Sequence, residues 1–273
     1  MSKRKCIIGV ISALVSNIVV IPVLVSILTK NMENPYLQSV IMALLEVIAL
    51  IVIMVLFGQK DKLRSTAKSF GKGIIVGGVM AAAAAVMLVI NTVRGITEVG
   101  TPKIGMMNGL LYALILLLSG GMSEELMYRG VIMNFVRETM GEGKKSMITS
   151  MLVSSVLFGA VHLVNLMGMG TDDVVGTLCQ VGYAMSLGFM LAAVYARSHN
   201  IWANMAIHFV YDLSLMIYGG IFKNEAVTVS GLAGGHSIVL ISAAIFAAGI
   251  AVAMFVLRKN KIGECFDNAA VAA

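Results

Sequence analysis

The chain alternates long apolar stretches with short polar connections from one end to the other. Eight of the apolar stretches have roughly 17 to 25 residues each, enough for an α-helix to cross the hydrocarbon core of a bilayer, about 30 Å thick. They lie at 7–29, 37–57, 73–92, 105–123, 147–168, 174–196, 200–221 and 235–257. Because backbone inside lipid must satisfy its own hydrogen bonds, the pattern predicts an all-α, polytopic membrane bundle of about eight transmembrane helices.

The composition agrees with a membrane protein. Hydrophobic residues make up 59% of the 273 residues and charged residues 12%, which is far more apolar surface than a soluble domain of this length carries. The sequence shows no internal repeat and no Pro- or Ser-rich linker. We therefore expect one integral-membrane domain over residues 1–273.

The net charge of +6 reflects membrane topology, and it does not indicate a nucleic-acid partner. With eight spans and both termini on one side, 16 of the 20 Lys and Arg residues fall on the side of the termini. The other four are Lys30, Arg94, Lys103 and Lys223. This split follows the positive-inside rule. It predicts a multi-pass protein of the cell membrane with both termini cytoplasmic, which we assign to a bacterial plasma membrane, with the lipid bilayer as its partner.

Three pairs of residues spaced four apart stand within or beside the apolar stretches of the second half. They are Glu125/Arg129, Phe158/His162 and His208/Asp212. Residues four apart share one face of a helix. Charged and polar groups are unfavourable in a bilayer by a few kcal/mol each, so several of them together indicate a functional site.

The first two pairs lie on a predicted hairpin of two helices. The helical pattern of the fourth span continues to about Thr139, breaks at 140–145 and starts again near Ser146. Glu125 lies 14 residues before Thr139, and His162 lies 16 residues after Ser146. At about 1.5 Å of rise per residue, the two are about 21 and 24 Å from the turn, so the hairpin places them at nearly one depth.

The same antiparallel register places Arg129 near Phe158. The third pair joins these residues only if the seventh span packs against the hairpin, which one sequence does not show. Each pair also has a purely structural explanation, such as a satisfied core imidazole for His162 or a structural hydrogen bond between His208 and Asp212. A functional site is favoured over these structural explanations, because all of them would have to be true at once in one small membrane protein.

These residues match the motifs of a known family. Over roughly residues 105–215 the chain resembles the CAAX prenyl protease and bacteriocin-processing family of intramembrane proteases, also called the Abi family. The family's Glu-Glu-x-x-x-Arg, Phe-x-x-x-His and His-x-x-x-Asn/Asp motifs occur here in order. They are Glu124–Arg129, Phe158–His162 and His208–Asp212.

The resemblance implies that the protein hydrolyses a peptide bond of a peptide or membrane protein, in a membrane cavity open to the cytoplasm. In that scheme Glu124 is the general base, and His162 holds or activates the water. His208 and Asp212 face the developing oxyanion. The substrate is left open among prenylated CAAX tails, leader peptides, bacteriocins and other membrane proteins, and a role in bacteriocin processing or immunity is among these possibilities.

In the same scheme Glu125 and Arg129 fix the first helix of the hairpin. Asp212 departs from the members that have Asn there, because an ionised carboxylate cannot donate a hydrogen bond. It would have to be protonated, orient His208 or bind a metal.

A cofactor is not identified by the sequence. His162, His208 and Glu124 form a set of two histidines and one glutamate that leaves open a divalent metal such as zinc. The chain has no His-Glu-x-x-His motif, and the resemblance leaves a metal-free glutamate mechanism as an equal alternative.

Two other functions stay open. A non-catalytic immunity or scaffold protein would keep its activity in a Glu124→Ala variant. A small proton-coupled transporter would use Glu46, which lies mid-span and away from the motifs in the sequence, although no inverted repeat supports this function. A bundle-facing Glu46 paired with a hydroxyl is an equal explanation of that residue.

Three further features are expected to have a structural role and no catalytic one. Gly73 and Gly77 permit close helix approach in the third span, within the bundle. Residues 58–72 form a short basic loop, and His199 is a solvated loop residue.

Overall fold

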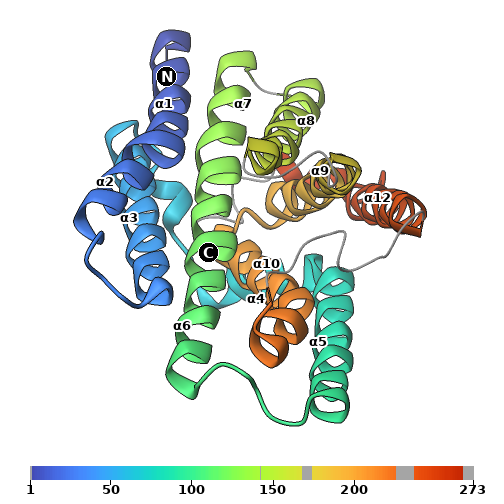
Figure 1. The fold of residues 1–273 in the computed structure, drawn as a ribbon. Coiled ribbons are helices and arrows are strands. Elements are labelled where there is room, and N and C mark those ends of the chain that lie inside the picture. The colour runs from blue at the N-terminus through green and yellow to red at the C-terminus, as the bar shows by residue number, and fades with distance from the viewer. Residues whose placement is uncertain (1, 142, 168–173, 226–236, 267–273) are drawn as a thin grey trace.

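The computed structural model describes residues 2–141, 143–167, 174–225 and 237–266 (Figure 1). Within these ranges every regular element is helical and none is a strand, which confirms the all-α prediction. The α-helices are α1 (Lys3–Val15), α2 (Ile21–Leu28), α3 (Pro35–Leu56), α4 (Ala67–Val76), α5 (Gly78–Glu98), α6 (Met106–Leu116), α7 (Asn134–Met140), α8 (Lys144–Ala160), α9 (Val174–Ser198), α10 (Ile201–Met216) and α12 (Ser237–Val256). The π-helical segments are η1 (Ser16–Val20), η3 (Leu117–Glu124), η4 (Leu126–Met133) and η7 (Ile217–Lys223), and the 3-10 segments are η2 (Lys60–Leu63), η5 (Val161–Met167) and η8 (Ile262–Phe266).

Consecutive elements combine into eight helices, in the described part of the chain, that are long and apolar enough to cross a membrane. They are Lys3–Leu28, Pro35–Leu56, Gly78–Glu98, Met106–Met140, Lys144–Leu166, Val174–Ser198, Ile201–Lys223 and Val239–Val256. Their number agrees with the eight predicted spans. The protein is therefore a multi-pass membrane protein.

The polar stretch predicted as a loop over residues 58–72 is partly helical. α4 begins inside it, because the Thr66 hydroxyl accepts a hydrogen bond from the Ser69 backbone N–H at 3.1 Å and caps the helix. α4 ends at Gly77, so the third span begins five residues later than predicted and covers Gly78–Glu98.

The two glycines predicted to allow close packing do so from α4 and its end. A Cβ atom added to Gly73 would lie 2.3 Å from the Cβ of Ala203, and one added to Gly77 would lie 2.4 Å from Cδ1 of Ile207. Both partners belong to α10, so the glycines serve packing within the protein. The prediction that they lie in the third span is wrong, because that span begins at Gly78.

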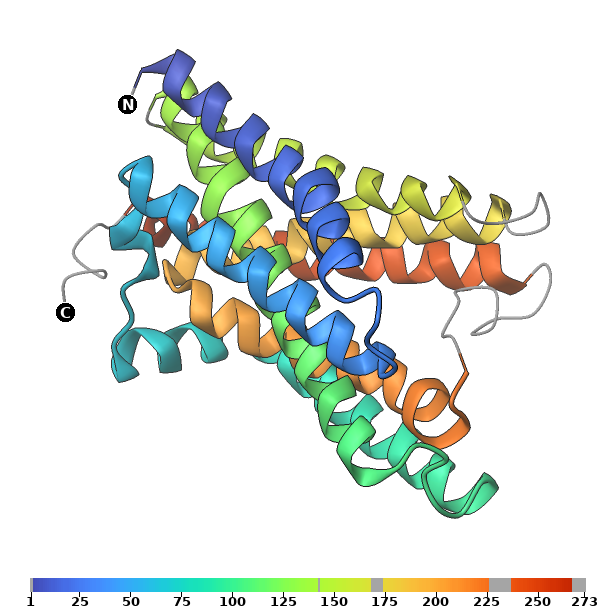
Figure 2. The same ribbon diagram turned by 60° about the vertical axis from the view of Figure 1, so that its left-hand side comes forward.

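The longest helix runs through the middle of the protein and supplies the first motif. It covers the 35 residues Met106–Met140, in which α6, η3, η4 and α7 follow one another without a break. α3 and α10 pack against η3, and α1 and α8 pack against η4 and α7. α8 also packs against α9, and α9 packs against α12, so these three helices lie side by side (Figure 2).

The end of α7 lies close to both ends of the described chain. α1 packs against α7, and the guanidinium of Arg137 lies 5.8 Å from the ring centroid of Phe266 in η8. Figure 2 shows both ends of the described chain, at residues 2 and 266, on the same side of the bundle. Whether this side faces the cytoplasm stays a prediction.

Candidate active site

The helix that carries Glu124 and Glu125 is wider than an α-helix. Leu117–Glu124 and Leu126–Met133 are π-helical, with backbone hydrogen bonds that span five residues. A π-helix rises less per residue than an α-helix. The predicted depth of about 21 Å for Glu125 is therefore too large, because it assumed the rise of an α-helix throughout.

A buried amide caps the carbonyl groups at the end of this wide segment. Asn134 is 8% exposed, and its Nδ2 donates toward the carbonyl oxygens of Arg129 and Gly130 at 2.9 Å each. Regular α-helical hydrogen bonding resumes in α7, which begins at Asn134. π-helical insertions are frequent at functional sites.

Glu125 and Arg129 form a fully buried ion pair. Nη1 of Arg129 lies 2.8 Å from Oε1 of Glu125, and both side chains are 0% exposed. Nη2 of Arg129 donates to the carbonyl oxygen of Gly188 in α9 at 2.8 Å, and the guanidinium lies 4.9 Å from the ring centroid of Phe158. The predicted proximity of Arg129 to Phe158 is confirmed. Arg129 is one of the 16 Lys and Arg residues that the charge count assigned to the side of the termini. Because it is buried within the membrane-spanning helix Met106–Met140, it does not belong in a count of charges outside the spans.

The third motif joins the first, as required for a shared site. Nδ1 of His208 lies 2.9 Å from Oε1 of Glu125, and Nδ2 of Asn204 donates to Oε2 of Glu125 at 3.1 Å. A carboxylate only accepts hydrogen bonds, so Nδ1 of His208 carries the hydrogen. Both oxygens of Glu125 are therefore occupied, and α10 is fixed against the central helix.

Glu124 has a different environment from its neighbour. Its side chain is 31% exposed, and its Oε2 lies 3.8 Å from Nε2 of His208, beyond hydrogen-bond distance. Nε2 of His208 also lies 3.6 Å from Oδ1 of Asp212, whose side chain is 17% exposed. The imidazole edge that faces away from Glu125 therefore lies near two further carboxylates.

Two glycines of η3 bring the central helix against α10. A Cβ atom added to Gly120 would lie 2.1 Å from Oδ2 of Asp212, and one added to Gly121 would lie 3.1 Å from Cβ of Phe209. The carboxylate of Asp212 thus packs directly on the backbone of η3. A side chain at position 120 would displace it.

His162 lies close to the site but belongs to a different element from the one predicted. α8 ends at Ala160, and His162 lies in the 3-10 segment η5. Its Nδ1 lies 3.0 Å from the carbonyl oxygen of Phe158. The Phe158 ring lies 5.7 Å from the ring of His162 and 5.8 Å from the ring of His208, measured between centroids, so it packs edge-on against both imidazoles. In the described part of the chain, no hydrogen bond or ion pair joins His162 to Glu124 or Glu125.

Several polar partners of the site are absent from the three motifs. Asn204 lies four residues before His208 and therefore on the same face of α10, a signal that the sequence contains. Glu46 accepts a hydrogen bond from Ser123 at 3.2 Å, so it faces the bundle and is paired with a hydroxyl. It is distant from the motifs in sequence but lies beside the first motif in space.

The residues proposed as metal ligands do not form a metal site in this geometry. In the described ranges, no group of three or more His, Cys, Asp or Glu side chains is arranged to hold a metal ion. Nδ1 of His208 is bonded to Glu125, and Nδ1 of His162 lies 3.0 Å from the carbonyl oxygen of Phe158. Metal dependence stays a prediction.

The fold and the site define a membrane protein with a buried polar centre built from three helices. A family model described as Type II CAAX prenyl endopeptidase Rce1-like matches residues 106–214, which include all three motifs. The match agrees with the resemblance to the CAAX protease family over these residues. Searches of curated proteins and of solved structures found no match.

Proposed function

We propose that the protein is an intramembrane endopeptidase in which Glu124 is the general base. The observation that supports this most is the difference between two adjacent carboxylates. Glu125 is fully buried, with both oxygens bonded, whereas Glu124 is 31% exposed and its nearest charged partner is 3.8 Å away. A general base needs a free lone pair within reach of water, which Glu124 has and Glu125 lacks.

His162 is proposed to hold the attacking water. A backbone carbonyl only accepts hydrogen bonds, so the 3.0 Å contact with Phe158 puts the ring hydrogen on Nδ1. In the neutral ring, Nε2 then carries a lone pair and can accept a hydrogen bond from water.

His208 and Asp212 are proposed to stabilise the oxyanion. The bond from Nδ1 to Glu125 fixes the ring and turns Nε2 toward Asp212, 3.6 Å away. When Nε2 carries a proton, it can donate to the oxyanion, and such a donor is worth about 3 kcal/mol of barrier in a water-poor site. Of the three roles open to Asp212, this geometry favours orienting His208.

The proposed reaction needs only water as its second reactant. Glu124 takes a proton as the water oxygen bonds to the carbonyl carbon, and the carbonyl electron pair moves to its oxygen. When this intermediate collapses, the C–N bond breaks and the proton passes from Glu124 to the leaving amine. The products are a new carboxyl group and a new amino group, and the carboxylate of Glu124 is restored.

The proposed substrate is a peptide bond in a membrane-associated peptide or protein. Prenylated CAAX tails, leader peptides and bacteriocins fit this class equally. We propose a plasma membrane with both termini cytoplasmic, and one domain over residues 1–273. The basic residues around two cavities at the end of the bundle that holds both termini support this orientation.

The test compares the purified protein with its Glu124→Gln variant in detergent, using a library of fluorogenic peptides. We expect turnover to fall by about 10²- to 10⁴-fold, because the isosteric amide cannot accept the proton from water. Glu98→Gln is the matched control, since Glu98 is 49% exposed at the end of α5. Its turnover should equal that of the wild type.

The outcomes separate the alternatives. Equal turnover by the wild type and the Glu124→Gln variant would remove Glu124 as the base. A biological activity that persists in that variant, with no cleavage of any peptide by the wild type, would favour an immunity or scaffold protein. Loss of turnover with a chelator, and its recovery on adding zinc, would show that a metal is required.

A further inference from the structure

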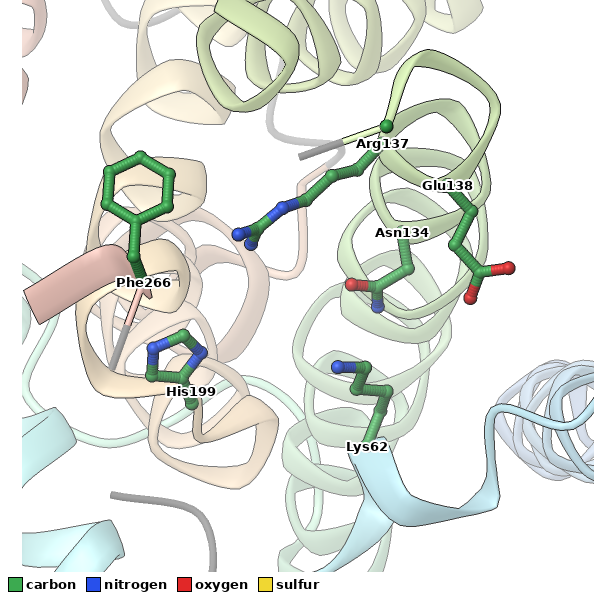
Figure 3. Close-up of a pocket in the computed structure, with 7 residues that line it drawn as sticks. Lys62, Asn134, Arg137, Glu138, His199 and Phe266 are labelled. Carbon is green, nitrogen blue, oxygen red and sulfur yellow. The ribbon is translucent and has the colours of Figure 1, made fainter. Parts of the chain in front are cut away.

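A second polar region lies at the end of the bundle that holds both termini. A cavity of about 380 Å³ opens there between α7, η2, η8 and the connection from α9 to α10 (Figure 3). It is lined by Lys62, Asn134, Arg137, Glu138, Gly141, His199 and Phe266. Its volume lies in the range of small-molecule sites, about 300 to 1,000 Å³.

Three basic side chains reach this cavity from three different parts of the chain. Lys62 comes from η2, Arg137 from α7 and His199 from the connection between α9 and α10, and Figure 3 shows them pointing toward a common space. The guanidinium of Arg137 donates to the backbone carbonyl oxygen of Cys265 at 3.5 Å, and Asp61 and Glu138 lie close enough to Lys62 to raise its pKa. Glu138 also lines the cavity, but it accepts a hydrogen bond from Gln59 and points away from Arg137.

His199 holds a backbone conformation that L-residues rarely adopt. Its φ is 54°, in the left-handed region, where a helix usually ends with Gly or Asn. Its backbone N–H donates to Tyr195 at 2.8 Å, and its Nε2 lies 3.1 Å from the carbonyl oxygen of Glu264. Because Nε2 makes the contact with Glu264, the other ring nitrogen of His199, Nδ1, takes no part in it. Strained residues of this kind are concentrated at functional sites.

The basic groups around the cavity repel one another, and the carboxylates near them offset this only in part. Burial lowers the pKa of His199, and the charges of Lys62, Arg137 and Lys72 lower it further, against the hydrogen bond to Glu264, which raises it. Burial and the charge of Arg137 lower the pKa of Lys62, while Glu138 and Asp61 raise it. A bound anion would relieve this repulsion.

The same end of the bundle carries a second cationic cavity that also borders η8. It has a volume of about 480 Å³ and is lined by Lys68, Lys72, Ile75, Val76, Arg197, Lys261 and Glu264. Glu264 is already bonded to Arg197 and Lys261. The two cavities together give this end of the protein a positive field that attracts anions.

We propose that the cavity around Arg137 binds a phosphate-bearing anion. Arg137 would hold two phosphate oxygens with its planar guanidinium, and Lys62 and a protonated His199 would supply further charge. Because the cavity lies at the ends of transmembrane helices, the phosphate has two sources. One is the headgroup of an anionic phospholipid, and the other is a soluble phosphate compound.

The test uses the full-length protein purified in detergent. One arm titrates inorganic phosphate and glycerol 3-phosphate and measures their dissociation constants by calorimetry. The other arm places the protein in nanodiscs of phosphatidylcholine, with or without phosphatidic acid, and measures retained lipid by native mass spectrometry. Binding of the soluble probes identifies a soluble ligand, whereas retention of phosphatidic acid alone identifies a headgroup site.

Two variants show whether the cavity is the site. In whichever arm the wild type shows binding, Arg137→Gln should weaken that binding by about tenfold, as expected for loss of one charged hydrogen-bonding group. Lys60→Gln is the matched control, since Lys60 lies two residues from Lys62 and outside the cavity lining, and it should stay within about twofold of the wild type. No binding in either arm, or equal weakening by both variants, would overturn the proposal. Glu124→Gln should bind as the wild type does, which separates this site from the proposed peptidase site.

His199→Asn provides a pH readout in a variant that suits the left-handed conformation. A bound anion favours the protonated imidazole, so binding by the wild type should strengthen relative to the variant as pH falls from about 7 to about 5. The difference between the two proteins is the quantity measured, because phosphate itself gains a proton in this range. Parallel pH curves would exclude His199 from the site, and thermal melting of both proteins checks that the variant folds.

Discussion

Two of the arginine–carboxylate pairs in the described part of the chain lie in contrasting places, one in the middle of the membrane helices and one near residue 266. Arg129 and Glu125 lie one turn apart on the same helix, 2.8 Å from each other, and both are 0% exposed. Arg197 and Glu264 are separated by 67 residues in the chain and join α9 to η8 at 2.9 Å. Their side chains are 8% and 27% exposed.

The difference in exposure decides what each pair does. Water cannot replace a lost partner in the inner pair, so each charge there depends on the other. The inner pair also holds Glu125 where it fixes Nδ1 of His208, and so it orders the candidate site. Water can reach the outer pair, which fastens the chain end beside two cationic cavities. The same chemistry therefore serves a site in one region and an attachment in the other.

The largest expected effect comes from breaking the inner pair. Arg129→Met should lower the free energy of unfolding by about 3 to 5 kcal/mol, because it leaves the carboxylate of Glu125 buried without its counter-ion. The measurement is reversible unfolding in mixed detergent micelles. Arg197→Met in the outer pair should lose only about 1 to 2 kcal/mol, and equal losses in the two variants would contradict the comparison.

A double variant tests the cause of that loss. Arg129→Met combined with Glu125→Gln removes both charges, so it should be more stable than Arg129→Met alone. If the double variant is less stable, the loss comes from packing of the arginine side chain, and the unpaired charge is not its cause.

A smaller effect is expected from a methyl group added beside Asp212. In Gly120→Ala the new Cβ would lie 2.1 Å from Oδ2 of Asp212, so the carboxylate must turn away from its place near His208. We expect peptidase activity to fall by about tenfold with little change in melting temperature, since the end of a side chain moves easily. Gly182→Ala is the control, because no atom lies within 4 Å of its Cβ position. Equal activity of the two variants would show that the position of Asp212 is unimportant.

The smallest effect concerns the outer pair and pH. The hydrogen bonds from Lys261 and Arg197 lower the pKa of Glu264 from 4.5 to about 2. Since the pKa is lower in the folded state, the stabilisation is fully present above pH 4.5 and is lost as pH falls toward about 2. The shift corresponds to about 3 kcal/mol at most, and partial exposure reduces it to about 1 kcal/mol. Unfolding measured at pH 6 and pH 3 should therefore show a smaller difference in Glu264→Gln than in the wild type, and equal differences would contradict it.

The features that the sequence predicts are those that depend on local pattern. Eight apolar stretches identify eight helices, because the length needed to cross a bilayer is a property of each segment alone. The pair Glu125/Arg129 is predicted by its spacing, because a helix brings residues four apart together without help from the rest of the fold.

The features that the sequence does not predict depend on distant contacts or on backbone geometry. Nothing local links Glu46 to Ser123, 77 residues away, or Arg129 to the backbone of Gly188. The π-helical turns also have no clear signal in the sequence. His199 was predicted to be solvated, and it is half-buried and bonded to Glu264, because η8 folds back over it.

The length of the central helix has a consequence for any substrate of the proposed peptidase. Glu124 lies 16 residues before Met140, the end of the helix Met106–Met140. At the rise of an α-helix this distance would be about 24 Å, and the π-helical segment Leu126–Met133 makes it shorter. An extended chain therefore covers it with at most about seven residues. A folded domain kept outside the bundle at that end therefore needs a tether of about this length before its first cleavable bond. The helix would set the shortest distance at which a peptide can be cut from such a domain.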